Sequence, residues 1–193
     1  MVFLRDGYVG ATMDEIAAVA SSSKQTVYRL FLDKETLFKE LVLTTVREAS
    51  DPIHDEVEQL RDSGNMEADL RDLAVRQLAT VMKPEIMALR RLVIGEATRF
   101  SELGREFYEL GPQRTLDALA RSFERLAQRG LLHFETAHMA AEHFNWLIMS
   151  TPLNRAMFLG EDTPAPGDLA LYAESGVRVF LAAYATEGSP SPK

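Results

Sequence analysis

The chain has 193 residues, of which 46% are hydrophobic and 26% charged, a balance typical of a globular protein of one or two domains. It contains no cysteine, which excludes disulfides, thiol catalysis and thiolate metal sites. No apolar run approaches the roughly 18 residues of a membrane span, and no secretory signal is visible, so we expect a cytoplasmic protein without a membrane partner.

The charge is distributed unevenly along the chain. Lysine and arginine total 21 against 29 aspartates and glutamates, which gives a formal net charge of −8. Residues 1–34 are neutral, so the excess of acidic charge falls in residues 35–193. Bulk attraction to nucleic acid is therefore not expected. Within the neutral part, residues 24–34 carry three bases and one acid, a small cationic cluster near the front of the chain.

The spacing of apolar residues predicts an all-α protein of about nine helices. Residues 113–129 are the clearest case, because apolar side chains recur there every three or four positions and Gly130 follows as a helix stop. No segment alternates strictly between apolar and polar residues, so strands are not expected. Residues 2–4 have the pattern of the last turn of an apolar helix whose start would lie upstream.

Turn and cap residues predict where the helices begin and end. A boundary near residue 50 divides the chain into residues 1–50 and 51–187, and residues 188–193 are expected to form a disordered tail. In chain order, the predicted breaks and caps are Gly7 and Gly10, Thr12 with Glu15, residues 21–23, Asp33, residues 51–52, residues 63–65, Pro84, Ser101, residues 111–112 and residues 163–167.

Residues 12–31 predict a helix-turn-helix unit. In the first helix, Ala17 has the small side chain needed where two helices cross steeply, and it shares a face with Ile16 and Ala20. Such a unit reads DNA when the leading residues of its second helix meet base edges in the major groove. It is also a common packing motif, so two short amphipathic helices that cap a bundle are the alternative. In the second helix, the residues expected to point inward are Val27, Leu30 and Phe31.

The same residues closely resemble a known family. The motif is Phe3-Leu4-x-x-Gly7-Tyr8-x-x-x-Thr12, followed by Ile16-Ala17-x-x-Ala20, Tyr28-x-x-Phe31 and Lys34-x-x-Leu37. It resembles the amino-terminal domain of TetR-family transcriptional regulators. The resemblance implies a homodimeric repressor whose two recognition helices enter successive major grooves of near-palindromic, double-stranded operator DNA.

On this resemblance we expect the DNA contacts to gather on the second helix. Its leading residues can hydrogen-bond bases or phosphates, and the residues behind them are placed to meet phosphates. The predicted contacts are Thr12, Lys24, Gln25, Thr26, Tyr28, Arg29 and Lys34.

Three positions depart from the family pattern. Ser21 and Ser22 stand where family members usually have glycine and a bulky apolar residue, and Leu30 stands where many have a phosphate-binding histidine or tyrosine. Ser22, Leu30 and the missing start of the first helix favour an alternative function, a small-molecule-binding or protein-interaction module of the same fold that has lost DNA binding. The intact helix from Lys24 to Arg29 and the presence of Lys34 oppose it.

A second resemblance covers residues 89–160 and is to the AefR-like group of carboxy-terminal domains. It implies a small amino-terminal helix-turn-helix domain followed by a larger helical ligand-binding and dimerisation domain, with a small-molecule effector of unknown identity. The matching residues are Leu89-Arg90-Arg91-Leu92-Val93, Glu96-x-x-Arg99-Phe100, Phe107-Tyr108-x-x-Gly111-Pro112, Ala140-Ala141-x-x-Phe144 and Pro152-Leu153.

Two segments, residues 137–149 and 169–184, are apolar on more than one face. A helix that is apolar all round must be buried on all sides. We therefore expect a homodimer through the last two long helices, in which two copies form a four-helix bundle and Gly176 allows close helix approach. An unusually central core helix within a monomer is the alternative.

The resemblance also implies a ligand pocket between the middle helices. Soft and aromatic side chains suit a pocket for apolar molecules, although for any one of them ordinary core is the more common role. The candidate lining residues are Met87, Phe100, Phe107, Tyr108, Phe123, Phe144, Trp146 and Met149.

No enzyme, metal or cofactor is expected. His138 and Glu142 lie four residues apart, but no further ligand recurs at helical spacing and a solvated surface pair explains them. The chain shows no nucleophile elbow, phosphate loop or spaced acid pair. The expected function is a regulator in which ligand binding alters the spacing of the two recognition helices.

Overall fold

The computed structural model describes residues 1–160 and 165–186, and within these ranges it contains no β-strand. A 3₁₀ turn, Leu60–Asp62, follows α4, and a π-turn, Glu109–Gln113, joins α7 to α8. The predicted tail at residues 188–193 and the first two residues of the loop predicted at 163–167 lie outside the described residues. The last two residues of that predicted loop, Pro166 and Gly167, begin the last α-helix instead. The α-helices are α1 (Val2–Gly10), α2 (Met13–Val19), α3 (Lys24–Leu30), α4 (Lys34–Gln59), α5 (Met66–Val81), α6 (Pro84–Glu96), α7 (Ser101–Tyr108), α8 (Arg114–Gln128), α9 (Ala137–Leu159) and α10 (Pro166–Tyr184).

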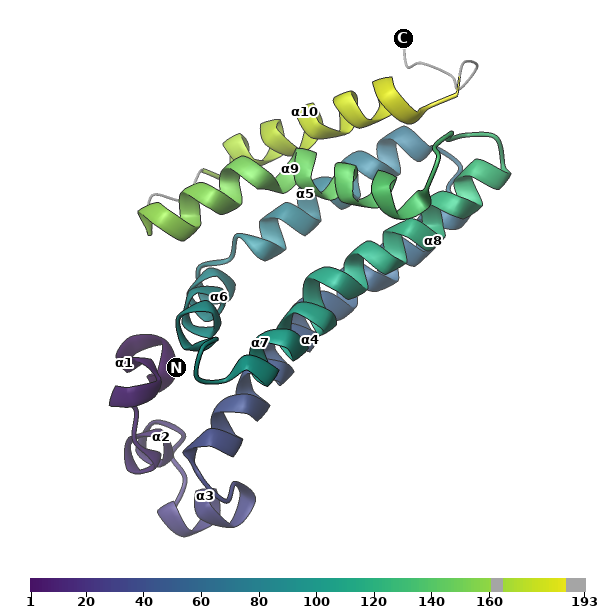
Figure 1. The fold of residues 1–193 in the computed structure, drawn as a ribbon. Helices are drawn as coiled ribbons and strands as arrows, with labels where there is room; N and C mark the ends of the chain where they lie inside the picture. The colour runs from purple at the N-terminus through teal and green to yellow at the C-terminus, as the bar shows by residue number, and fades with distance from the viewer. Residues whose placement is uncertain (161–164, 187–193) are drawn as a thin grey trace.

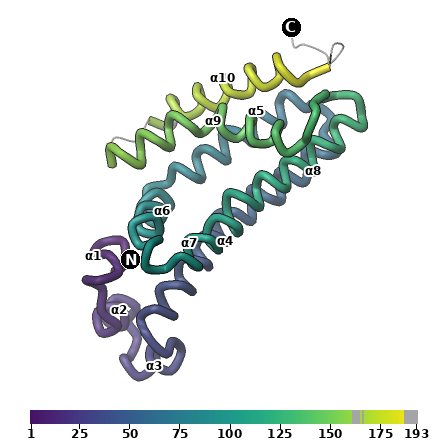
Figure 2. The backbone as a smooth tube through the Cα atoms, in the orientation of Figure 1, coloured from purple at the N-terminus to yellow at the C-terminus, as the bar shows by residue number. Residues whose placement is uncertain are grey.

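The helices form two groups joined by α4. Figure 1 shows α1, α2 and α3 at one end of α4, whereas α9 and α10 lie beside each other toward the other end. The chain runs away from the first group along α4, comes back through α5 and α6, and leaves again along α7 and α8 (Figure 2). α4 packs along α8, and α9 packs against both α8 and α10. The predicted all-α fold is confirmed.

α4 continues through the place where the sequence predicted a kink or restart. It spans 26 residues, from Lys34 to Gln59, with Pro52 inside the helix. Proline removes one helical hydrogen bond, but Ile53 and Val57 directly after it are buried against the larger core. This packing outweighs the local preference for a break, so the predicted domain boundary at residue 50 falls within a continuous helix.

The expected break at residues 111–112 is also absent. Instead of separating two helices, Gly111 and Pro112 lie in the π-turn that carries α7 directly into α8. A π-turn accommodates proline without ending the helix because its hydrogen bonds skip to a more distant carbonyl. A side chain on Gly111 would come within 3.0 Å of Val46 Cγ2, so glycine lets this turn press closely on α4.

Two hydrophobic cores are present, and they do not divide at residue 50. The first joins α1–α3 and the first half of α4 to α6 and α7, and its centre is an aromatic cluster of Phe3, Tyr8, Phe38 and Phe100. The second joins the rest of α4 to α5 and α8–α10, and contains buried aromatic side chains that include Phe180. The small domain is therefore packed on residues of the larger one.

The predicted helix caps are largely observed. The Thr12 hydroxyl accepts the Glu15 backbone N–H at 3.2 Å and Pro84 begins α6, as predicted. Asn65, expected only as part of a loop, caps α5, whereas Ser101, expected as a cap, is the first residue of α7 and makes no capping hydrogen bond within the described residues. Asp33 accepts the Thr36 backbone N–H at 2.8 Å, and this hydrogen bond holds the pKa of its carboxyl below the usual value. The Glu15 carboxylate pairs with Arg5.

The turn between α2 and α3 is closed by a left-handed residue. Ser21 has φ = 50°, its N–H donates to the Ala18 carbonyl at 3.1 Å, and the Ser22 N–H donates to the Ala17 carbonyl at 2.9 Å. These two bonds form a Schellman motif, whose left-handed position is usually glycine. Gly130, at the end of α8, is also left-handed, with φ = 74°, and it stops this helix as predicted.

The inward face of the helix-turn-helix unit was predicted only in part. Ala17 and Val27 are buried at the crossing of α2 and α3, as expected. Leu30, expected to point inward, is 66% exposed, and Ala20 is exposed as well. Each lies at the end of its short helix, where the chain turns away before it can bury the side chain.

We predict that Ser21→Gly raises the free energy of unfolding by about 0.5–1 kcal/mol, because glycine adopts φ > 0 without the steric cost that serine incurs. Urea denaturation would measure it. Ser22→Gly is the matched control and should stabilise nothing, since Ser21 is the only non-glycine residue with positive φ in the described ranges. Equal effects of the two substitutions would contradict the explanation.

Candidate DNA interface and ligand cavity

α3 presents one face to solvent at the far end of the molecule. Its buried side is anchored by Val27, and the cap at its start is completed by Ser23, whose hydroxyl accepts the Thr26 N–H at 3.0 Å. Figure 1 shows α3 next to the start of α4, at the end opposite α10. A short helix held at its start and along one side has a fixed orientation, which a recognition helix requires.

The predicted contact residues on α3 are accessible. Gln25, Tyr28 and Arg29 are exposed, and their side chains form no hydrogen bond or ion pair with any residue that the structure describes. The Thr26 hydroxyl is shared with Ser23 at 2.8 Å. Thr12 is exposed at the start of α2, with its oxygen engaged as the helix cap and its O–H still able to donate.

The cations around α3 are largely engaged within the protein. Lys24 forms an ion pair with Asp14 of α2, and both side chains are more than half exposed. Lys34 donates to the backbone carbonyls of Tyr8 and Ala11, each at 2.9 Å, and to that of Val9 at 3.3 Å. All three N–H groups of this ammonium are thereby used, and it also lies 4.7 Å from the centre of the Tyr8 ring. A phosphate contact by Lys34 therefore has to share or replace one of these bonds.

A cavity of about 140 Å³ lies between the middle helices. It is walled by residues of α4, α5, α6, α9 and the rod formed by α7, the π-turn and α8. Four of the predicted residues line it: Phe107, Tyr108, Trp146 and Met149.

The other four predicted pocket residues belong to the cores. Phe123 and Phe144 are fully buried and pack on Phe180, and Phe100 joins the aromatic cluster beside α1. Met87 is buried in the larger core. These four residues do not line this cavity, and the sequence could not separate them from the others, because a large apolar side chain on an apolar helix face gives the same pattern in a core as in a cavity wall.

Polar lining residues were missed by the sequence analysis. Gln77 Nε2 donates to Asn145 Oδ1 at 3.2 Å, which leaves Gln77 Oε1 as a buried acceptor without a partner in the described part of the chain. Arg90 also lines the cavity. In the sequence these residues look like the polar faces of amphipathic helices, and only the packing of α5, α6 and α9 turns them inward.

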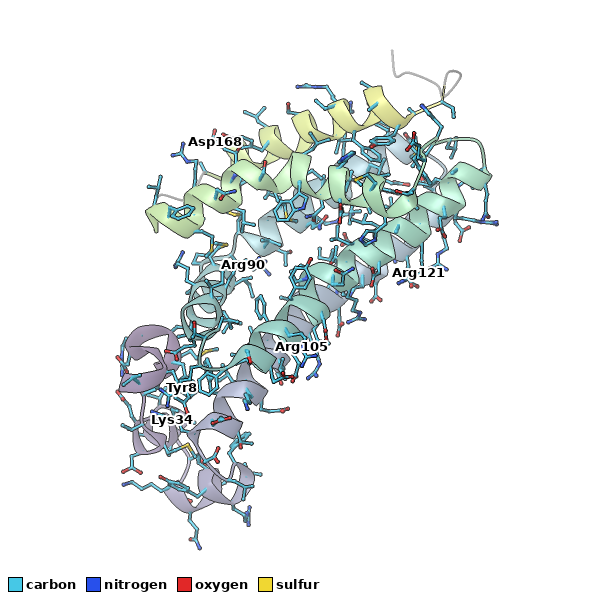
Figure 3. The ribbon with its side chains drawn as sticks, viewed as in Figure 1. Tyr8, Lys34, Arg90, Arg105, Arg121 and Asp168 are labelled. Carbon is cyan, nitrogen blue, oxygen red and sulfur yellow. The ribbon has the colours of Figure 1, made fainter. Side chains whose placement is uncertain are left out.

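The Arg90 guanidinium is held in apolar surroundings. Its Nε is buried without a hydrogen-bond partner, the guanidinium carbon lies 5.9 Å from the centre of the Phe107 ring, and burial lowers the pKa of the group. Figure 3 places Arg90 between α6 and the rod that contains α7 and α8.

His54 lies behind the same wall. Its Nε2 is 3.1 Å from the Thr115 hydroxyl, which donates to the Gly111 carbonyl. Burial, and next the positive charge of Arg114, lower the pKa of this imidazole, so it is neutral at pH 7. The chain His54–Thr115–Gly111 ties α4 to α8 and to the π-turn.

Both family models that match the chain describe regulators. A model of bacterial regulatory proteins of the tetR family matches residues 1–41, and a model of the C-terminal domain of AefR-like transcriptional repressors matches residues 68–186. The chain belongs to the TetR family of transcriptional regulators. The resemblances read from both ends of the sequence are therefore confirmed, and the helix-turn-helix unit is the DNA-binding domain of a TetR-family fold.

Solved structures agree with this assignment. A protein from Mesorhizobium loti assigned to the TetR family is 40% identical with a TM-score of 0.91, over 96% of this chain and 92% of that one. The Flavonoid-responsive Regulator FrrA is 30% identical with a TM-score of 0.70, over 97% and 93% of the two chains. SmeT, the repressor of the Stenotrophomonas maltophilia multidrug efflux pump SmeDEF, is 22% identical with a TM-score of 0.67, over 100% and 92%, and shows the shared fold alone. No protein with curated annotation matches the chain.

The TetR-family chain shows little that points to other classes of function. Its family models and similar structures are those of transcriptional regulators rather than enzymes. Over residues 1–160 and 165–186, no helix is long and apolar enough to span a membrane. In the same ranges no cluster of three acidic or histidine side chains could hold a metal ion, and His138 lies 3.5 Å from Glu142 as a surface pair.

We predict that Asp14→Asn strengthens DNA binding by this TetR-family chain several-fold. The substitution frees Lys24 from its ion pair and removes a negative charge beside α3, so one more phosphate can be neutralised and the slope of log K against log salt should steepen by about 0.9. Fluorescence anisotropy at several salt concentrations would measure both quantities. Asp117→Asn on α8 is the control of equal charge change; an equal gain there, or none at Asp14, would contradict the assignment.

Proposed function

We propose that this chain is a homodimeric repressor that leaves its operator when a small molecule occupies the cavity. The observation that carries the proposal is the place of the cavity, whose wall includes residues of α4, the helix that begins directly after the recognition helix α3. Repression rather than activation is supported by the family model that matches the carboxy-terminal part, which describes repressors.

The cavity and α4 are coupled by close contacts. Val46, Ala49 and Ile53 of α4 line the cavity, and Gly111 of the π-turn touches Val46 across it. The Ser50 hydroxyl, which also lines the cavity, lies 3.4 Å from the Leu110 carbonyl. A molecule in this space meets α4 and the π-turn together, so it favours a different position of α4 and, through it, of α3.

The outer surface of α9 and α10 supports a homodimer through these two helices. Leu171 and Val179 are 66% and 52% exposed, and they share one face of α10 because they lie two helical turns apart. Trp146 and Leu147 are exposed on α9 as well. Within the protomer Gly176 packs closely against the backbone of Leu147.

The name of one relative gives a first choice of effector. The 30% identical regulator FrrA is described as flavonoid-responsive, and the cavity here offers aromatic walls from Phe107, Tyr108 and Trp146. Planar aromatic molecules are therefore the first compounds to test as inducers.

A module that keeps the sensor and lacks DNA binding is the second candidate. The observation that favours it is the electrostatics around α3, where Lys24 and Lys34 are engaged within the protein and Leu30 is exposed at a position that many relatives use for phosphate. The exposed Gln25, Tyr28 and Arg29 favour DNA binding over this alternative.

We predict sequence-specific binding to the DNA that flanks the coding region of this protein. Lys24→Ala and Tyr28→Ala should each weaken it by about tenfold, since each removes a predicted contact, and neither should reduce the salt slope by a full phosphate, because Lys24 is paired with Asp14 and Tyr28 is uncharged. Anisotropy titrated over salt measures both effects, with Arg121→Ala on α8 as the control. Specific binding that neither substitution changes would refute the contact assignment, and the absence of specific binding would favour the sensor module.

We predict that Val179→Asp converts the dimer to monomers, because it places a charge in an apolar interface. Sedimentation velocity at micromolar concentration would show the change, and operator affinity should fall with it since two half-sites are no longer bound together. Val19→Asp, at an equally exposed position on α2, adds the same charge and should leave the dimer intact. A dimeric Val179→Asp protein would place the interface elsewhere.

A further inference from the structure

Arg90 is the single charged residue among the described residues that line the cavity. The other lining side chains are apolar, hydroxyl or amide groups, and His54 behind the wall is neutral at pH 7. No carboxylate of the described chain forms an ion pair with Arg90, and its Nε has no hydrogen-bond partner there. The cavity thus contains one positive charge that the protein leaves uncompensated.

Such an arrangement is costly in the empty protein. Burial of a guanidinium without an anion or hydrogen-bond acceptors forfeits its hydration, and the lowered pKa of Arg90 reflects that loss. None of the acidic side chains in the described ranges forms an ion pair with this guanidinium. A largely desolvated, unpaired charge that lines a cavity is explained best by a partner that enters the cavity.

We propose that the effector is an acidic amphipathic molecule, with a carboxylate or similarly charged oxyanion that pairs with Arg90 and an apolar body that lies among the aromatic and aliphatic walls. This inference rests on the proposed role of the cavity as the effector site. Arginine suits the task because its planar guanidinium binds a carboxylate through two parallel hydrogen bonds.

A second polar group of the cavity, Gln77, sets the direction of the ligand. Gln77 Oε1 is a buried acceptor without a partner in the described residues, and an anion beside it would be repelled. The acidic end is thereby directed to α6, and the body of the ligand extends toward α5 and α9, where Asn145 and Trp146 also line the space. A hydroxyl on the body would satisfy Gln77 Oε1.

The test compares an acid with its uncharged isostere. 3-Phenylpropanoate and 3-phenylpropanamide, and likewise octanoate and octanamide, differ in charge at almost constant shape. Isothermal titration of the purified protein, without DNA, should show each acid binding at least about tenfold tighter than its amide. Arg90→Met should bring this ratio close to one, mainly by weakening the acid.

Matched variants separate charge from shape. Arg90→Lys keeps the charge without the planar fork and should retain part of the preference for acids. Arg121→Met, an exposed arginine on α8 that Figure 3 also labels, should retain all of it. In the unliganded protein Arg90→Met should raise the melting temperature, because it removes an uncompensated buried charge; a lower melting temperature would show that Arg90 is a structural partner and would overturn the inference.

The remaining outcomes are decisive as well. Equal binding of acid and amide by the unsubstituted protein, or binding of none of the acids at millimolar concentration, overturns the inference whether or not Arg90→Met folds. Failure of the repressor proposal looks different, because a chain that does not bind operator would still distinguish acid from amide. If only neutral molecules release the protein from its operator, the repressor proposal stands and the proposal of an acidic effector is overturned.

Discussion

The unbroken course of α4 is the constraint on which the other features depend. Phe38 and Val42 on its first half lie in the core of the DNA-binding domain, whereas Ile53 and Val57 on its second half lie in the larger core. A helix rises about 1.5 Å per residue and resists bending within a packed core. The two domains are thus joined by a stiff element with a cavity along its side, instead of by a linker, so a change in the larger domain can reach α3.

The basic side chains of the chain have contrasting roles. Lys34 holds the end of α1 through three backbone carbonyls, and Lys24 is paired on the surface with Asp14. Both are satisfied within the protein. Arg90 is only partly exposed, its Nε is fully buried, and it lines a cavity without an anionic partner in the described ranges. A low dielectric makes an unpaired charge much more costly in that setting than on the surface, which is why Arg90 is informative about a ligand and an exposed arginine is not.

The region of α6 and α7 connects the two ends of the molecule. Phe100 packs against Tyr8 and Phe38 of the DNA-binding domain, and seven residues later Phe107 forms part of the cavity wall. Arg90 and Leu89 are neighbours on α6, and both line the cavity. Leu89 is also buried in the core of the small domain. The cavity and the core of the DNA-binding domain are therefore joined by a short chain of packed side chains, which is the physical condition for coupling between them.

Local signals in the sequence determined the helical class, the caps at Thr12 and Asp33, the helix stop at Gly130 and the family, because each depends on a few neighbouring residues. Tertiary packing decided what local rules could not. It carried α4 through Pro52, joined α7 to α8 at Gly111, left Leu30 in solvent, and placed Phe123 and Phe144 in a core while it turned Arg90 and Gln77 into the cavity. The physical reason is that helical periodicity gives the direction of a side chain about its own helix, whereas the neighbour it meets, whether core, cavity or water, depends on helices far away in the sequence.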